Sequence, residues 1–158
     1  MNIRTATEAD FDTIMKLIND AFQVERFFKN RDRVDDADLK HYFETGTFLV
    51  SDEGNRITGC VYVSRKDDRA YFGLLSVDSS QQKKGIGRRL IAAAEEFARE
   101  TGARFMDLKL INLRTELPGI YFKLGYRISG TQFYPEERKH MLSQPVHFLC
   151  MSKELGHR

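Results

Sequence analysis

A chain of 158 residues, 41% hydrophobic and 30% charged, has the composition of an ordinary globular protein, and its length predicts one domain over residues 1–158. Its 25 basic and 23 acidic residues nearly balance, which argues against a nucleic-acid partner because nucleic-acid-binding proteins usually carry a strongly basic face. We see no signal peptide, no apolar run near the roughly 20 residues that span a bilayer, and only two cysteines. We therefore expect a cytoplasmic protein without a membrane partner.

The first third of the chain predicts one strand and two helices. Thr7, with Asp10 three positions later, is typical of a helix N-terminus. The apolar side chains that follow recur with the 3.6-residue period of one helix face. The expected elements are a strand at 3–6, a helix through 11–22 and a shorter helix at 36–44, with an irregular, charged stretch at 24–36.

The middle of the chain predicts an antiparallel meander. Strand-like runs are joined there by short turns, one around Gly54 and one around Asp67. The expected strands cover 47–51, 56–65 and 70–77.

The last part predicts an amphipathic helix from about Ile86 to Thr101, which Gly102 ends. The strand that follows should be parallel to the strand at 70–77, because a helix connects the two. The remaining expected elements are strands at 105–113, 126–133 and 146–151 and a short helix at 116–124. The pattern as a whole predicts a mixed α/β (α+β) fold.

The stretch between the strand at 70–77 and the long helix is the most informative in the chain; it reads Gln82-Lys83-Lys84-Gly85-Ile86-Gly87-Arg88-Arg89. Its two glycines let the backbone approach a ligand closely. The helix that follows supplies free N–H groups with a partial positive charge, and basic side chains flank the turn. These features predict an anion site, above all for phosphate.

Three interpretations compete for this turn, two of which bind a nucleotide. A dinucleotide-binding fold would place a third glycine where Leu90 stands, and a nucleotide-hydrolysing loop would need Gly-Lys-Ser/Thr after four spacer residues, which is absent. On the spacing alone, a helix start with solvated charges remains an alternative.

A second motif lies downstream, where Asn112 is followed by Tyr121-Phe122-Lys123-Leu124-Gly125-Tyr126. Together with Gln82, Gly85 and Gly87, this block resembles the GNAT superfamily of N-acetyltransferases, and the resemblance covers nearly the whole chain. It implies a mixed, mostly antiparallel sheet of about six to seven strands flanked by about four helices, with one parallel pair of strands splayed apart.

The resemblance implies acetyl-coenzyme A, or another acyl-coenzyme A, as the donor and no metal. Backbone N–H groups of the glycine turn would surround the pyrophosphate, and basic side chains would reach the other phosphates. The pantetheine arm would lie in the splay against the end of the strand at 70–77, as a peptide adds to a sheet edge. The residues expected to bind the donor are Leu75, Ser76, Val77, Gln82, Lys83, Lys84, Gly85, Ile86, Gly87, Arg88, Asn112, Tyr121 and Lys123.

Acyl transfer to an amine needs an oxyanion site and a proton for the departing thiolate. The backbone N–H near Leu75 is the candidate oxyanion donor, and Tyr121 stands at the family position of the general acid. A general base is harder to assign, because the strand at 70–77 has no carboxylate where some members of the family carry one. Glu116, Asp107 and a chain of water molecules remain candidates.

The acceptor should lie among the irregular connections at 24–36 and 132–144, which commonly border the acceptor pocket in this family. We expect a primary amine on a small molecule or peptide, attacked directly in a ternary complex by a monomer or homodimer. Two alternatives stay open: a non-catalytic acyl-coenzyme A-binding or sensor domain of the same fold and, with weaker support, a nucleic-acid module.

Overall fold

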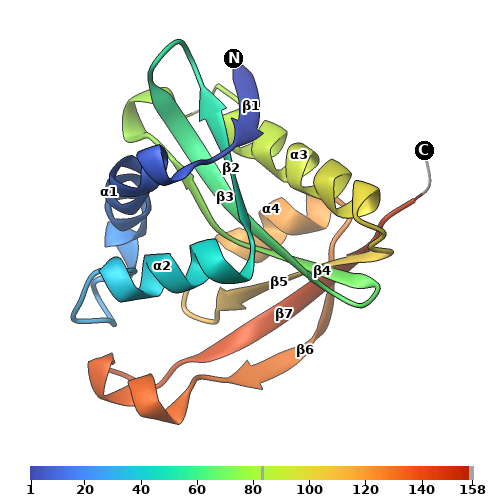
Figure 1. Ribbon diagram of the computed structural model, residues 1–158. Helices are drawn as coiled ribbons and strands as arrows, with labels where there is room; N and C mark the ends of the chain where they lie inside the picture. Colours follow the sequence, from blue (N-terminus) through green and yellow to red (C-terminus); the bar gives the residue numbers. More distant parts are fainter. Residues whose placement is uncertain (83, 157–158) are drawn as a thin grey trace.

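The computed structural model describes residues 1–82 and 84–156, and all of its named strands belong to one seven-stranded sheet of order β1-β2-β3-β4-β5-β7-β6 (Figure 1). The strands are β1 (Asn2–Thr5), β2 (Thr47–Asp52), β3 (Ile57–Lys66), β4 (Arg69–Val77), β5 (Phe105–Ile111), β6 (Arg127–Phe133) and β7 (His147–Glu154). The α-helices are α1 (Phe11–Ala21), α2 (Asp36–Thr45), α3 (Ile86–Glu100) and α4 (Leu117–Lys123). Short 3-10 helices are η1 (Glu8–Asp10), η2 (Phe22–Glu25), η3 (Ser79–Gln81) and η4 (Glu136–Met141).

The predicted fold class is confirmed. The strands β2, β3 and β4 form the expected antiparallel meander, and β4 and β5, joined through α3, form the one parallel pair of the named strands. Most strand ends lie within one residue of the sequence expectation, and two differ by more. Strand β5 ends at Ile111 rather than residue 113, and β7 continues to Glu154 because its residues from Phe148 to Glu154 pair with β5.

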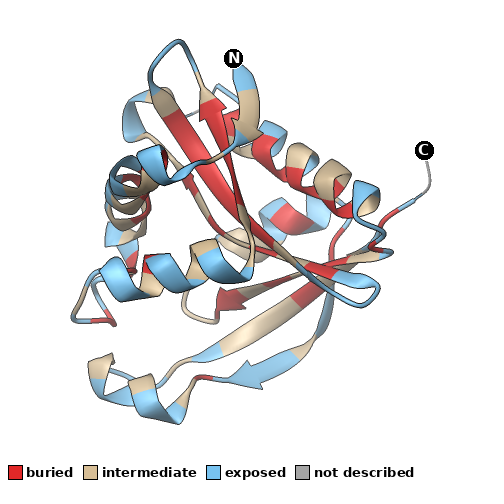
Figure 2. Ribbon diagram, in the orientation of Figure 1, coloured by how far each residue is buried: buried red, intermediate tan, exposed pale blue. Residues whose placement is uncertain are grey.

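Helices cover both faces of the sheet, so the central strands are buried on both sides (Figure 2). In β3 the side chains alternate between two hydrophobic cores. Val61 and Val63 pack with α3, whereas Cys60 and Tyr62 pack with α1 and α2. This burial explains why β3 is continuously apolar in its middle rather than alternating.

The parallel pair is short. Its register runs from Arg69–Phe105 to Tyr71–Asp107 and then stops, so the two strands diverge towards the C-terminal end of β4. Just beyond this point Leu74 adopts a left-handed backbone (φ 55°), and the pairing of β4 with β3 shifts register between Cys60 and Tyr62. A left-handed leucine is rare in a strand and marks a bulge. The expected splay is therefore present, and a bulge accompanies it.

The long helix α3 begins directly after a left-handed glycine, Gly85 (φ 77°), so the glycine turn sits at a genuine helix N-terminus. None of the helices in the described part of the chain is long and apolar enough to cross a membrane.

Candidate active site

A cavity of about 530 Å³ opens where β4 and β5 diverge. Its walls come from the two splayed strands, from α4 and from α2. The two irregular connections at 24–36 and 132–144 complete it, the first with Glu25, Lys29 and Arg33 and the second with Tyr134 and Arg138. Both loops singled out in the sequence thus border one cavity.

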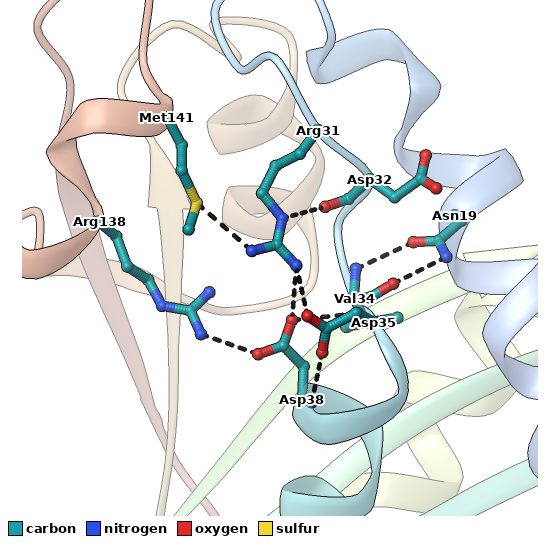
Figure 3. A network of polar contacts seen from close by, with 8 residues as sticks. All are labelled: Asn19, Arg31, Asp32, Val34, Asp35, Asp38, Arg138 and Met141. Atoms are coloured by element: carbon teal, nitrogen blue, oxygen red, sulfur yellow. Dashed lines mark hydrogen bonds and ion pairs between the residues drawn. The ribbon is translucent and has the colours of Figure 1, made fainter.

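A carboxylate on α2 ties these two loops together (Figure 3). Asp38 accepts hydrogen bonds from Arg31 in the first loop (3.1 Å) and from Arg138 in η4 (2.8 Å). Burial would raise the pKa of Asp38, but Arg138 and the backbone N–H of Asp35 hold it below its usual value. Asp38 is therefore an anion at neutral pH, and it fixes the side of the cavity formed by α2 and η4.

Tyr121 reaches the cavity from α4. Its ring lies 6.0 Å, centroid to centroid, from the rings of Phe72 and Tyr126, so packing fixes its position. Its hydroxyl forms no hydrogen bond within residues 1–82 and 84–156. Burial raises the pKa of Tyr121 to about 12, which Arg114 offsets only in part. The side chain thus presents a neutral O–H donor.

Arg114 joins two carboxylates near α4. Its guanidinium donates to Glu25 (3.0 Å), which lines the cavity, and to Glu116 (2.9 Å), which does not. The Glu25 side chain is 9% exposed and that of Glu116 is 55% exposed. Burial would raise the pKa of Glu116, but its own backbone N–H and Arg114 hold it below the usual value. The structure therefore brings Glu25, which the sequence did not single out, closer to the cavity than Glu116.

The end of β4 supplies backbone more than side chains. Leu75 lines the cavity, whereas the buried Ser76 hydroxyl turns back to donate to the carbonyl of Leu74 (3.0 Å). Val77 pairs with Gly59 of β3 on its other edge. No pairing with β5 extends to these residues, so that edge of β4 faces the splay.

The glycine turn keeps room for a ligand at two positions. A Cβ added to Gly85 would meet nothing within 4 Å, and one added to Gly87 would meet only Val77, at 3.7 Å. Gln82 and Arg88 are exposed beside it, Lys84 reaches back to Gln81, and Ile86 is buried against the sheet. Lys83 lies outside the described residues.

Other expected site residues are separate from the cavity. Asn112 exchanges two hydrogen bonds of 2.9 Å with the backbone of His147, so it extends the pairing of β5 with β7. Lys123 is exposed in the last turn of α4. Asp107 is bound by Arg69 (2.6 and 2.8 Å) where β4 and β5 are still paired, and it does not line the cavity.

Comparison with known proteins shows the family of the chain. Residues 11–126 match the model of the acetyltransferase (GNAT) family. The chain belongs to this family.

Proteins named as acetyltransferases or acyltransferases resemble the chain over most of its length. L-amino acid N-acyltransferase MnaT of Escherichia coli is 31% identical over 151 residues, which cover 84% of this chain and 87% of that protein. Human N-acetyltransferase 8B is 29% identical over 74% of this chain, and the chain spans 56% of that longer protein. The structure of yncA from Salmonella typhimurium, solved with acetyl-coenzyme A, superposes with a TM-score of 0.75 at 20% identity, covering 100% of this chain and 95% of that one.

The residues of this GNAT chain fit a coenzyme A donor. The open space at Gly85 and Gly87 lies at the N-terminus of α3, and Gly87 stands beside Val77, at the end of the β4 edge that does not pair with β5. Leu75 of the same strand end lines the cavity. The glycine turn and the helix N-terminus suit phosphate, and the unpaired edge of β4 suits an amide-bearing arm. Among the described residues no three His, Cys, Asp or Glu side chains lie close enough to hold a metal ion.

Proposed function

We propose that this GNAT protein transfers an acetyl group from acetyl-coenzyme A to a primary amine by direct attack in a ternary complex. One observation carries the proposal: the cavity opens at the splay of β4 and β5, with the hydroxyl of Tyr121 in its wall and no hydrogen-bond partner for it among the described residues. The names of the relatives, N-acetyltransferase and N-acyltransferase, support the reaction class.

The donor would be held by the chain in two places. The N–H groups around Gly85 and Gly87 bind phosphate oxygens, helped by the α3 dipole and by Arg88. The edge of β4 at Leu75 and Val77 binds the arm, and the N–H near Leu75 faces the thioester oxygen as oxyanion donor. When bound, acetyl-coenzyme A supplies the electrophilic carbonyl carbon and the thiolate leaving group.

Tyr121 would act as a hydrogen-bond donor rather than as a full acid. Its pKa is raised to about 12, whereas a thiol has a reference pKa of about 8.5. Complete transfer of its proton to a thiolate would therefore be uphill by about 5 kcal/mol. A neutral hydroxyl that donates to developing negative charge on sulfur avoids this cost.

Glu25 is the carboxylate best placed to receive the proton of the attacking amine. It lines the cavity, and its ion pair with Arg114 fixes the direction of its oxygens. Glu116 shares the same guanidinium but is largely exposed. We propose Glu25 as the base, directly or through one water molecule, and Glu116 as a partner that orients Arg114.

The donor is tested by calorimetric titration with acetyl-coenzyme A, followed by thiol release with a panel of amines. We expect binding and turnover, and Tyr121→Phe should lower kcat roughly 10- to 100-fold while donor affinity stays within about two-fold. Binding without thiol release for any amine would favour the sensor alternative. An unchanged rate in Tyr121→Phe would return this residue to a packing role.

The base is tested with a matched pair of substitutions. Glu25→Gln should lower kcat/KM about 100-fold, because the carboxylate that accepts the proton is lost, whereas Glu116→Gln should cost less than about five-fold. The pH dependence of kcat/KM in both variants separates loss of a base from loss of shape. The reverse order of effects would restore Glu116 as the base.

A further inference from the structure

The cavity carries more positive than negative side chains. Within the described residues five basic side chains line it, Lys29, Arg33, Lys109, Arg114 and Arg138, against the two carboxylates of Glu25 and Asp38. Glu25 is paired with Arg114 and Asp38 with Arg138. The excess is therefore carried by Lys29, Arg33 and Lys109. A cavity that took only a cationic amine would repel its own substrate.

Lys29 is the most unusual of the three. It is 6% exposed, lines the cavity, and its ammonium forms no hydrogen bond or ion pair within residues 1–82 and 84–156. Burial, followed by the neighbouring charge of Arg33, lowers the pKa of Lys29 to about 8. A buried ammonium without a partner is costly, so it is retained where a ligand supplies the missing charge.

Arg33 lies beside it, and its guanidinium interacts with the side chain of Tyr42. It forms no ion pair with a carboxylate in the described part of the chain, and its guanidinium lies 5.6 Å from the centre of the Phe22 ring. Lys109, by contrast, stacks on the ring of Phe148 at 4.6 Å, which compensates its charge in part. Lys29 and Arg33 are thus the two cations that an incoming anion would meet.

The backbone that carries both side chains is held in place before any ligand arrives. Val34, the neighbour of Arg33, exchanges two hydrogen bonds of 2.9 Å with the side chain of Asn19 (Figure 3). Lys29 forms a β-bridge with Leu142, and the next residue, Asn30, donates to the carbonyl of Met141 (3.0 Å). Binding between two ordered segments loses less conformational entropy than binding to flexible ones.

We propose that the acceptor carries a carboxylate besides its amine, and that Lys29 and Arg33 bind this carboxylate inside the cavity. The inference rests on the proposed N-acetyl transfer. Arg33 offers a planar fork that matches a carboxylate, and Lys29 offers a point charge. The aromatic side chains that also line the cavity, among them Phe22, Phe28 and Phe148, favour an acceptor with an apolar portion.

The test compares three probes that share a phenethylamine core: L-phenylalanine, L-phenylalaninamide and phenethylamine itself. Thiol release should give a kcat/KM for the free acid at least about ten-fold above the other two. The amide has the less basic amine, so its larger neutral fraction works against this expectation. Equal or greater activity with the amide or with phenethylamine would overturn the inference and leave N-acetyl transfer intact.

Substitutions then assign the effect to the two cations. Lys29→Met and Arg33→Gln should each lower kcat/KM for L-phenylalanine at least about ten-fold and change that for phenethylamine less than three-fold. Lys139→Met, the same change at an exposed lysine of η4 paired with Glu136, is the control and should change neither. Equal losses for both probes would mean that the cations serve the reaction itself, and would overturn the assignment.

Binding without catalysis separates this inference from the proposed function. The acid 3-phenylpropanoate has no amine to acetylate, so calorimetry with the protein saturated by coenzyme A reports the anion site alone. Binding that Lys29→Met weakens at least about ten-fold would support the site even if no amine releases thiol. No binding of 3-phenylpropanoate, together with equal turnover of acid and amide, would reject it.

Discussion

Two buried charges on opposite sides of the sheet differ in whether they have a partner. Under α3, Glu95 accepts a hydrogen bond from the hydroxyl of Tyr126 (2.8 Å) and is paired with Lys153 (3.0 and 3.2 Å). In the cavity, Lys29 has no such partner within the described residues, although it is as deeply buried as Glu95. A buried charge with hydrogen-bonded partners is compatible with a stable fold, whereas a buried charge without a partner can gain one when a ligand binds. The degree of burial does not distinguish the structural role of Glu95 from the ligand-binding role of Lys29, but the presence or absence of hydrogen-bond partners does.

The largest expected effect comes from removing one charge on each side. Glu95→Gln should lower the free energy of unfolding by about 2–3 kcal/mol, because Lys153 loses its partner in a partly buried place. Lys29→Met should leave it unchanged or raise it, because an uncompensated ammonium is replaced by an apolar chain of similar length. Urea denaturation of both variants checks the comparison. A loss above about 1 kcal/mol in Lys29→Met would contradict it.

The pH dependence of stability sharpens the same comparison. The pKa of Lys29 is about 8 in the folded protein against about 10.4 in an unfolded chain, so the unfolded state binds more protons between these values. Stability of the wild type should therefore rise from about pH 8 towards pH 10, by at most about 3 kcal/mol. The charged side chains that act on the Lys29 ammonium are those of Arg33, Glu25, Arg31 and Arg138.

Denaturation of wild type and Lys29→Met between pH 7.5 and 9.5 isolates the contribution of this one group, since other titrations cancel in the difference. Any stability advantage of Lys29→Met should shrink as the pH rises. A difference that stays constant over the range would show that the Lys29 ammonium is compensated in solution.

The smallest effect concerns space instead of charge. Gly87 in the first turn of α3 has room for a Cβ, so Gly87→Ala should stabilise the protein by about 0.5–1 kcal/mol. The same methyl group would occupy the surface that the donor phosphates approach, and donor affinity should fall about five- to ten-fold. Thermal unfolding and calorimetry measure the two changes. A parallel gain in stability and affinity would remove Gly87 from the donor site.

The sequence predicted what depends on local pattern and missed what depends on distant contact. Strand and helix order followed from apolar periods and turn residues, and the glycine turn was recognisable because its residues are contiguous. Glu25 and Arg114, in contrast, are 89 positions apart in the chain, and no local sequence pattern predicts that they form an ion pair. Leu74 escaped prediction for another reason: a left-handed backbone is unfavourable for leucine, so only the surrounding sheet explains it.

The short pairing of β4 with β5 has a consequence for how the molecule holds together. Among the described residues, the sheet strands β1–β4 and β5–β7 are joined by three register pairs from Arg69 to Tyr71, by the Arg69–Asp107 ion pair, and by two backbone hydrogen bonds to the carbonyl of Asp68 just before β4. Past these contacts, β4 and β5 are held together by side-chain packing. A donor arm bound between the diverging ends of β4 and β5 would serve as an additional strand. Saturation with coenzyme A should therefore slow amide hydrogen exchange in both strands together and couple the unfolding of the two parts of the sheet.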